Sequence, residues 1–185
     1  MKGKKFFYII IIMYLTTLIS TYIFVNNYVI AKDNITNSND YYNLGKQSSE
    51  EGNYDNAINY YKKALELEPD NENILYDLGS IYAFQNKNDL AIETFKLALK
   101  INPNHFKSCN HLGYIYLIND NYDLALEYYE KAIQIAPEDS EPYFNIGIVY
   151  KNKGIKDLAI KYLTKAKNLN PDLTQIINLQ LDKLK

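Results

Sequence analysis

The sequence predicts an array of stacked structural repeats, because several groups of residues recur at a fixed interval of 34. Four prolines mark this interval, at Pro69, Pro103, Pro137 and Pro171. Four Leu-Gly or Ile-Gly pairs keep the same step, as do two sets of alanines that begin at Ala57 and Ala64. Between the two alanines of each unit lies a bulky residue: Tyr61, Phe95, Tyr129 and Leu163. A fixed period of this length indicates units that bury their apolar faces against their neighbours.

The units resemble the tetratricopeptide repeat (TPR) family in their period, in their small residues and in the proline that closes each unit. The resemblance implies an all-α fold, a right-handed superhelical α-solenoid of helix–turn–helix units. The four units run over 38–71, 72–105, 106–139 and 140–173. The aromatic residue that the family usually has near the start of the first helix is kept in only two units, at Tyr41 and Tyr143. Ser48 also stands where the other units have tyrosine, so we expect looser packing in the first unit.

Local signals inside each unit agree with a helical hairpin. Glycine in the first helix costs about 1 kcal/mol in helix propensity, which predicts that the second helix approaches closely there, at Gly45, Gly79, Gly113 and Gly147. Residues that tolerate a left-handed backbone mark the turn between the helices: Gly52, Asn86, Asp120 and Gly154. Residues 174–185 predict a capping helix whose inward face consists of Ile176, Ile177, Leu181 and Leu184.

The N-terminal residues predict a segment that enters or crosses a membrane. A basic head over residues 1–5 precedes twenty uncharged residues, Phe6 to Val25, which as a helix span about 30 Å. Over residues 1–31 we consider a retained anchor and a signal peptide cleaved after Ala31, and the length of the apolar stretch favours the anchor. The preceding lysines predict a cytoplasmic N-terminus, so both alternatives place the repeats outside the cytoplasm. Residues 32–37 are expected to form a polar linker.

Composition and spacing argue against nucleic-acid binding, metal binding and catalysis. The chain contains no arginine, and residues 38–185 carry a net charge of −5, whereas nucleic-acid affinity rests on clustered basic residues. The cluster of His105, Cys109 and His111 lacks an evident fourth ligand, and Cys109 falls at a packing position of its unit. Glycine-rich phosphate loops and nucleophile motifs are also absent from the sequence. We therefore expect no enzyme activity, no cofactor and no metal.

The remaining functional feature is a surface for a partner. The resemblance to the TPR family implies that the first helices line a concave groove, so the predicted function is a non-catalytic scaffold that binds a peptide or protein there. An alternative is an accessory factor of cell-envelope assembly that binds glycan or envelope enzymes. The sequence names neither the partner nor the oligomeric state. Each groove aromatic has a second interpretation, packing against a neighbouring helix. The predicted groove residues are Tyr42, Lys46, Tyr76, Phe84, Asn110, Tyr114, Ile118, Phe144 and Ile148.

Overall fold

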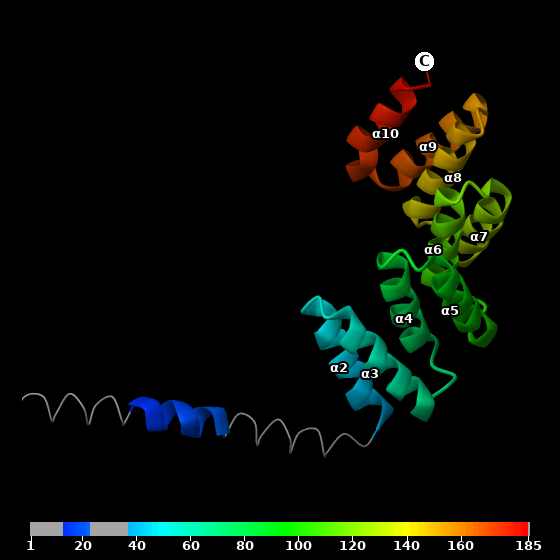
Figure 1. The fold of residues 1–185 in the computed structure, drawn as a ribbon. Helices are drawn as coiled ribbons and strands as arrows, with labels where there is room; N and C mark the ends of the chain where they lie inside the picture. The colour runs from blue at the N-terminus through cyan, green and yellow to red at the C-terminus, as the bar shows by residue number, and fades with distance from the viewer. Residues whose placement is uncertain (1–12, 23–36, 185) are drawn as a thin grey trace, which may run out of the picture.

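A computed structural model describes residues 13–22 and 37–184, and over residues 38–169 the chain forms four consecutive helical hairpins (Figure 1). The prediction of an all-α solenoid of four units with a C-terminal cap is confirmed. Each unit pairs a first helix with a second helix that packs closely against it. The hairpins are α2 (Ser38–Glu50) with α3 (Tyr54–Leu67), α4 (Glu72–Phe84) with α5 (Asn88–Ile101), α6 (Phe106–Ile118) with α7 (Tyr122–Ile135), and α8 (Ser140–Asn152) with α9 (Lys156–Leu169). A short 3-10 helix, Pro171–Leu173, leads into the final helix α10 (Thr174–Asp182).

Only part of the predicted N-terminal segment is described. Residues 13–22 are helical, whereas the rest of the predicted anchor 6–25, the predicted cleavage site at Ala31 and residues 32–36 lie outside the described residues. Within residues 13–22 and 37–184, none of the helices combines the length and the apolar character needed to cross a bilayer.

The turns inside the hairpins have the predicted left-handed backbone. The angle φ is +77° at Gly52, +58° at Asn86, +56° at Asp120 and +75° at Gly154. Asparagine and aspartate tolerate this region better than other residues with a side chain, because their short polar groups bond locally. The same turn therefore forms in every unit although the residue differs.

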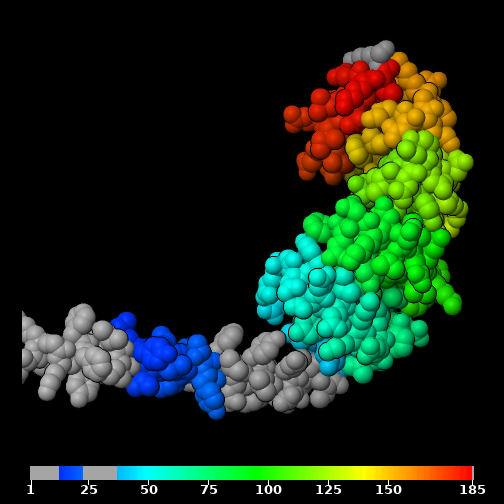
Figure 2. Space-filling view, in the orientation of Figure 1, coloured from blue at the N-terminus to red at the C-terminus, as the bar shows by residue number. Residues whose placement is uncertain are grey.

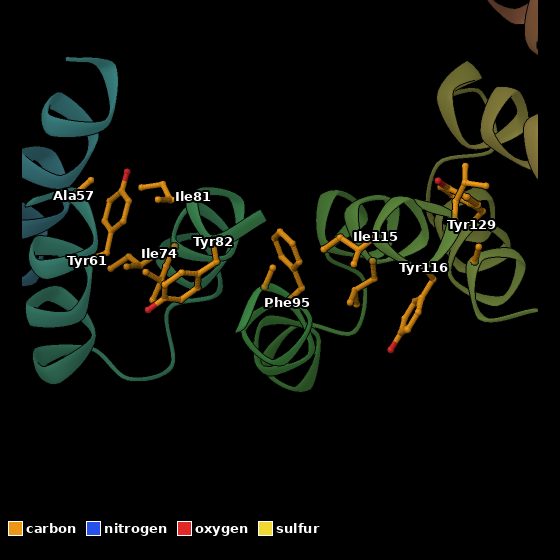
Figure 3. Packing of buried hydrophobic residues seen from close by; sticks show 14 of the residues in the cluster. Ala57, Tyr61, Ile74, Ile81, Tyr82, Phe95, Ile115, Tyr116 and Tyr129 are labelled. Carbon is orange, nitrogen blue, oxygen red and sulfur yellow. The ribbon is translucent and has the colours of Figure 1, made fainter. Parts of the chain in front are cut away.

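The close approach of the two helices at the glycines is also confirmed. A Cβ atom added to Gly113 would lie 2.6 Å from the Tyr129 ring, and one added to Gly79 would lie 2.9 Å from the Phe95 ring. Both rings are completely buried. Figure 3 shows Tyr61, Phe95 and Tyr129 placed one after another along a core that continues from unit to unit. In the first three units a ring of the second helix therefore occupies the space that glycine leaves open in the first helix, and in the fourth unit Leu163 takes that place.

Replacement of Tyr129 by phenylalanine tests the cost of a buried hydroxyl. Among the described residues, the Tyr129 hydroxyl finds no hydrogen-bond partner although it is buried, and burial raises the pKa of Tyr129. Since Phe95 fills the equivalent position in the second unit, we expect Tyr129→Phe to raise the free energy of unfolding by about 1 kcal/mol. Urea denaturation measures this change. Tyr61→Phe is the control, since Tyr61 lines an open cleft and its replacement should not bring the same gain in stability. A loss of stability in Tyr129→Phe that Tyr61→Phe does not share would contradict the expectation.

The C-terminal cap packs through a narrower stripe than predicted. Ile177 is completely buried against Leu163 and Ala166, and Leu181 and Leu184 pack partly buried against this cluster. These three cap residues follow helical spacing and share one face. The prediction was wrong for Ile176, which is 50% exposed. A helix turns by about 100° per residue, so Ile176 points away from the stripe that Ile177 defines.

Candidate binding groove

The first helices form the inner side of a curved array. Figure 1 shows α4 and α6 on the inner side of the arc, with α5 and α7 on its outer side. First helices of neighbouring units also contact one another, α4 with α6 and α6 with α8. The space-filling view shows the same arc, hollowed on its inner side (Figure 2). The arrangement of a concave face lined by first helices therefore follows from how the hairpins stack.

The predicted groove residues differ widely in how they are placed. Phe84, Tyr114 and Ile118 expose 67%, 53% and 48% of their surface, and Lys46 is exposed as well. Asn110 is buried, and its side-chain amide oxygen Oδ1 has no hydrogen-bond partner among the described residues. The remaining residues are half-buried and pack against the core: Tyr42, Tyr76, Phe144 and Ile148. The free apolar surface is thus concentrated on α4 and α6.

Lys46 and Phe84 meet in an open cleft between the first two units, which we call the unit 1–2 cleft. Its volume is about 330 Å³, and its lining includes Tyr54, Tyr61 and Asp77 as well as these two residues. The rings of Tyr54 and Phe84 lie 4.8 Å apart between their centroids. Asp77 accepts a hydrogen bond at its Oδ2 from the hydroxyl of Tyr42, at 2.9 Å. The cleft therefore combines an aromatic wall with a carboxylate.

The carboxylate of Asp77 is partly removed from water. This desolvation raises the pKa of Asp77, while the hydrogen bond from Tyr42 and the charge of Lys46 act in the opposite direction. Desolvation, followed by this same hydrogen bond, raises the pKa of Tyr42 to about 12. Burial favours the neutral form of an acid, and a hydrogen-bond donor favours its charged form. The hydrogen bond from Tyr42 and the charge of Lys46 thus offset only part of the cost of removing the Asp77 carboxylate from water.

Both histidines of the chain contact Tyr76 at the junction of the second and third units. The rings of His105 and His111 each lie 5.3 Å from the Tyr76 ring, centroid to centroid. His105 also caps α6, because its Nδ1 accepts a hydrogen bond from the Ser108 N–H at 3.2 Å. An acceptor at Nδ1 requires that this nitrogen carries no proton. Burial lowers the pKa of both histidines, in agreement with neutral rings.

These contacts predict that the repeats lose stability as the pH falls from 7 to 5. A lowered pKa means that the folded state binds fewer protons than the unfolded state, so the free energy of unfolding decreases below the ordinary histidine pKa of about 6.5. Protonation of His105 at Nδ1 also removes the cap, which is worth about 1 kcal/mol. Urea denaturation at several pH values measures the effect. His105→Asn keeps a capping side chain, as at Asn71, and we expect a smaller pH dependence; an unchanged dependence would contradict this explanation.

Sequence reasoning missed three features of the groove. Tyr54 was missed because it begins a second helix, and no pattern in the sequence brings it to Phe84. The sequence did contain a signal for Asp77, because the equivalent residues of the other units, Asn43, His111 and Asn145, are also polar. The helix cap at His105 was also signalled by the sequence, because the equivalent residues of the other units cap their helices: Asn37, Asn71 and Asp139.

Together, the hairpins and their curved inner face define a class of protein, the helical repeat array. The chain belongs to the family described as the Cilia and flagella-associated protein 70 middle TPR-like domain, which matches residues 41–170. It is therefore a TPR protein. Repeats of this family are in general non-catalytic scaffolds, and their fold is consistent with protein partners.

Solved structures support the same fold. The protein in the crystal structure of MamA has a sequence 29% identical to this chain. The two structures match with a TM-score of 0.72 over 79% of this chain and 85% of the MamA chain. MamA from Desulfovibrio magneticus RS-1 (residue 41 to the end) is 24% identical, with a TM-score of 0.69 over 80% of this chain and 92% of the other. PilF of Pseudomonas aeruginosa is also 24% identical in sequence, with a TM-score of 0.71 over 80% of this chain and 67% of the PilF chain. These last two show the fold alone. No curated protein matches the chain.

Proposed function

We propose that this protein is a scaffold that binds a peptide or a partner protein in the concave groove of its repeats. The observation that carries the proposal is the free apolar surface of Phe84, Tyr114 and Ile118 on the first helices. Phe84 and Ile118 hold equivalent positions of two neighbouring units, and Tyr114 lies about one helical turn before Ile118. Bulky side chains in a groove fit a partner helix or an extended segment with apolar anchors. Aromatic anchors also supply most of the binding energy in many interfaces.

A photocrosslinking experiment in the native host tests the groove. A photoreactive phenylalanine analogue replaces Tyr114 in one variant and Leu97 in a second, matched variant. Leu97 is also about half exposed, but it lies on the outer helix α5. We expect adducts with a partner from position 114 that do not form from position 97. The same adducts from both positions, or none from position 114, would contradict binding in the groove.

We further propose that residues 6–25 form an N-terminal membrane anchor and that the repeats lie outside the cytoplasm. Support comes from the twenty uncharged residues and the lysines before them. Fractionation of the full-length protein with mass measurement tests this. An intact chain in the membrane fraction, with repeats open to external protease, is expected. A mature chain that starts near Lys32 in a soluble fraction would instead show a cleaved signal peptide. Repeats protected from external protease until lysis would overturn the orientation.

A further inference from the structure

We propose that the unit 1–2 cleft is a subsite for an arginine side chain of a bound peptide. This inference rests on the proposed function of the groove and adds the chemistry that the first two units select. Three properties of the cleft carry it: a carboxylate with a free oxygen, a surplus of negative charge and an aromatic wall. The carboxylate and the charge are independent of the apolar surface on which the proposed function rests, whereas the aromatic wall shares Phe84 with it.

The carboxylate is Asp77. Its Oδ2 accepts the hydrogen bond from Tyr42, and no hydrogen bond reaches Oδ1 from the residues that the structure describes. The ion pairs of residues 13–22 and 37–184 join other residues, Lys131 with Glu127 and Lys153 with Asp123. Asp77 is therefore a partly desolvated anion without a cation in direct contact. Such a group gains from a charged donor that arrives with a ligand, because charge-assisted hydrogen bonds are the stronger ones.

The charge around the cleft has the sign that attracts a cation. Glu50 lies on its rim, opposite a single lining cation, Lys46. The ammonium of Lys46 lies 6.0 Å from the centre of the Tyr42 ring, and it takes no part in the ion pairs found among the described residues. Over residues 38–105 the first two units carry 11 acidic residues and 6 lysines. The surplus favours the approach of a basic peptide segment.

The aromatic wall distinguishes arginine from lysine. Phe84 is largely exposed and packs on Tyr54 at the side of the cleft. A planar guanidinium stacks on an aromatic ring and still donates hydrogen bonds from its edge, whereas an ammonium is a compact, strongly hydrated charge. The chain contains no arginine, so the side chain must come from a different protein. A second copy of this chain does not provide it.

Selection from a random nonapeptide library displayed on yeast tests the proposal, with the full-length chain in detergent as the bait. We expect the selected peptides to be enriched in arginine relative to the unselected library. In the best binder, replacement of that arginine by citrulline, which has the same shape without the charge, should weaken binding about tenfold, the effect of one charge-assisted hydrogen bond. Replacement by lysine should have an intermediate effect.

Two variants locate the effect in the cleft. Asp77→Asn keeps an oxygen for the Tyr42 hydroxyl, and it should remove the difference between the arginine and citrulline peptides. Phe84→Ala should remove the preference for arginine over lysine. The control Glu93→Gln, an equal change of charge at an exposed position of α5, should leave both preferences intact. Peptides that bind without arginine enrichment, or an enrichment that survives Asp77→Asn, would overturn the subsite but leave groove binding standing. Failure to select any peptide would overturn both.

Discussion

Gly113→Val should lower the free energy of unfolding by about 3 kcal/mol, at the upper end of the range for overpacked cores. The added Cβ would meet the Tyr129 ring at 2.6 Å. That ring is completely buried, so it cannot turn aside without displacing its neighbours. The change also removes a glycine from a helix, which by itself favours folding by a few tenths of a kcal/mol. Urea denaturation of the full-length chain measures the net effect, and the steric cost should dominate.

A double-mutant cycle shows whether the loss comes from this one contact. In Tyr129→Ala the ring is absent, so the valine side chain enters space that would otherwise be a cavity. We therefore expect the double variant to be more stable than the sum of the two single losses, by at least about 1 kcal/mol. Strict additivity would show that Gly113 matters for another reason, such as the backbone of α6, and would contradict the packing explanation.

The hairpins were predictable because every local signal occurs four times in the same register. A single Asn86 says little about backbone conformation, but its equivalence to Gly52 and Gly154 indicates the left-handed turn that the structure contains. The glycines and rings were predictable for the same reason. Ile176 was not, because α10 has no later unit with which to compare its orientation. Where the repetition ends, an apolar pattern alone left two adjacent isoleucines indistinguishable.

The groove was predictable only as a location. Register identified the first helices, which lie on the inner side of the arc at α4 and α6, but two tyrosines predicted for the groove, Tyr42 and Tyr76, pack partly against the core. The unit 1–2 cleft depends on contacts between units, such as that between Tyr54 and Phe84. A contact of this kind needs the rotation between neighbouring hairpins, which the repeat pattern does not contain. The chemistry of the groove, unlike its position, therefore required the structure.

Phe95→Ala should destabilise the whole array, with a loss of about 3–5 kcal/mol in the free energy of unfolding. Phe95 is completely buried in the second unit, and its core cluster extends from Ala57 to Val149. In a repeat array, stability is the sum of the units and of their interfaces, and an inner unit contributes two interfaces. The loss should therefore appear as lower protection from hydrogen exchange in helices on both sides, α2 and α3 as well as α6 and α7.

Ile177→Ala provides the contrast, because it removes an equally buried side chain at the end of the array. Ile177 belongs to a separate cluster with Leu163 and Ala166, and the described contacts of α10 lie within the fourth unit and the short helix before α10: α10 packs on α9 and on that short helix, and Gln180 accepts a hydrogen bond from Lys151 of α8. We expect loss of protection over 174–182, with little change in the first three units, since an end helix detaches without breaking an inner interface. Equal loss of protection throughout the repeats in this variant would mean that the array unfolds as one cooperative unit. The position of a cavity would then matter less than its size.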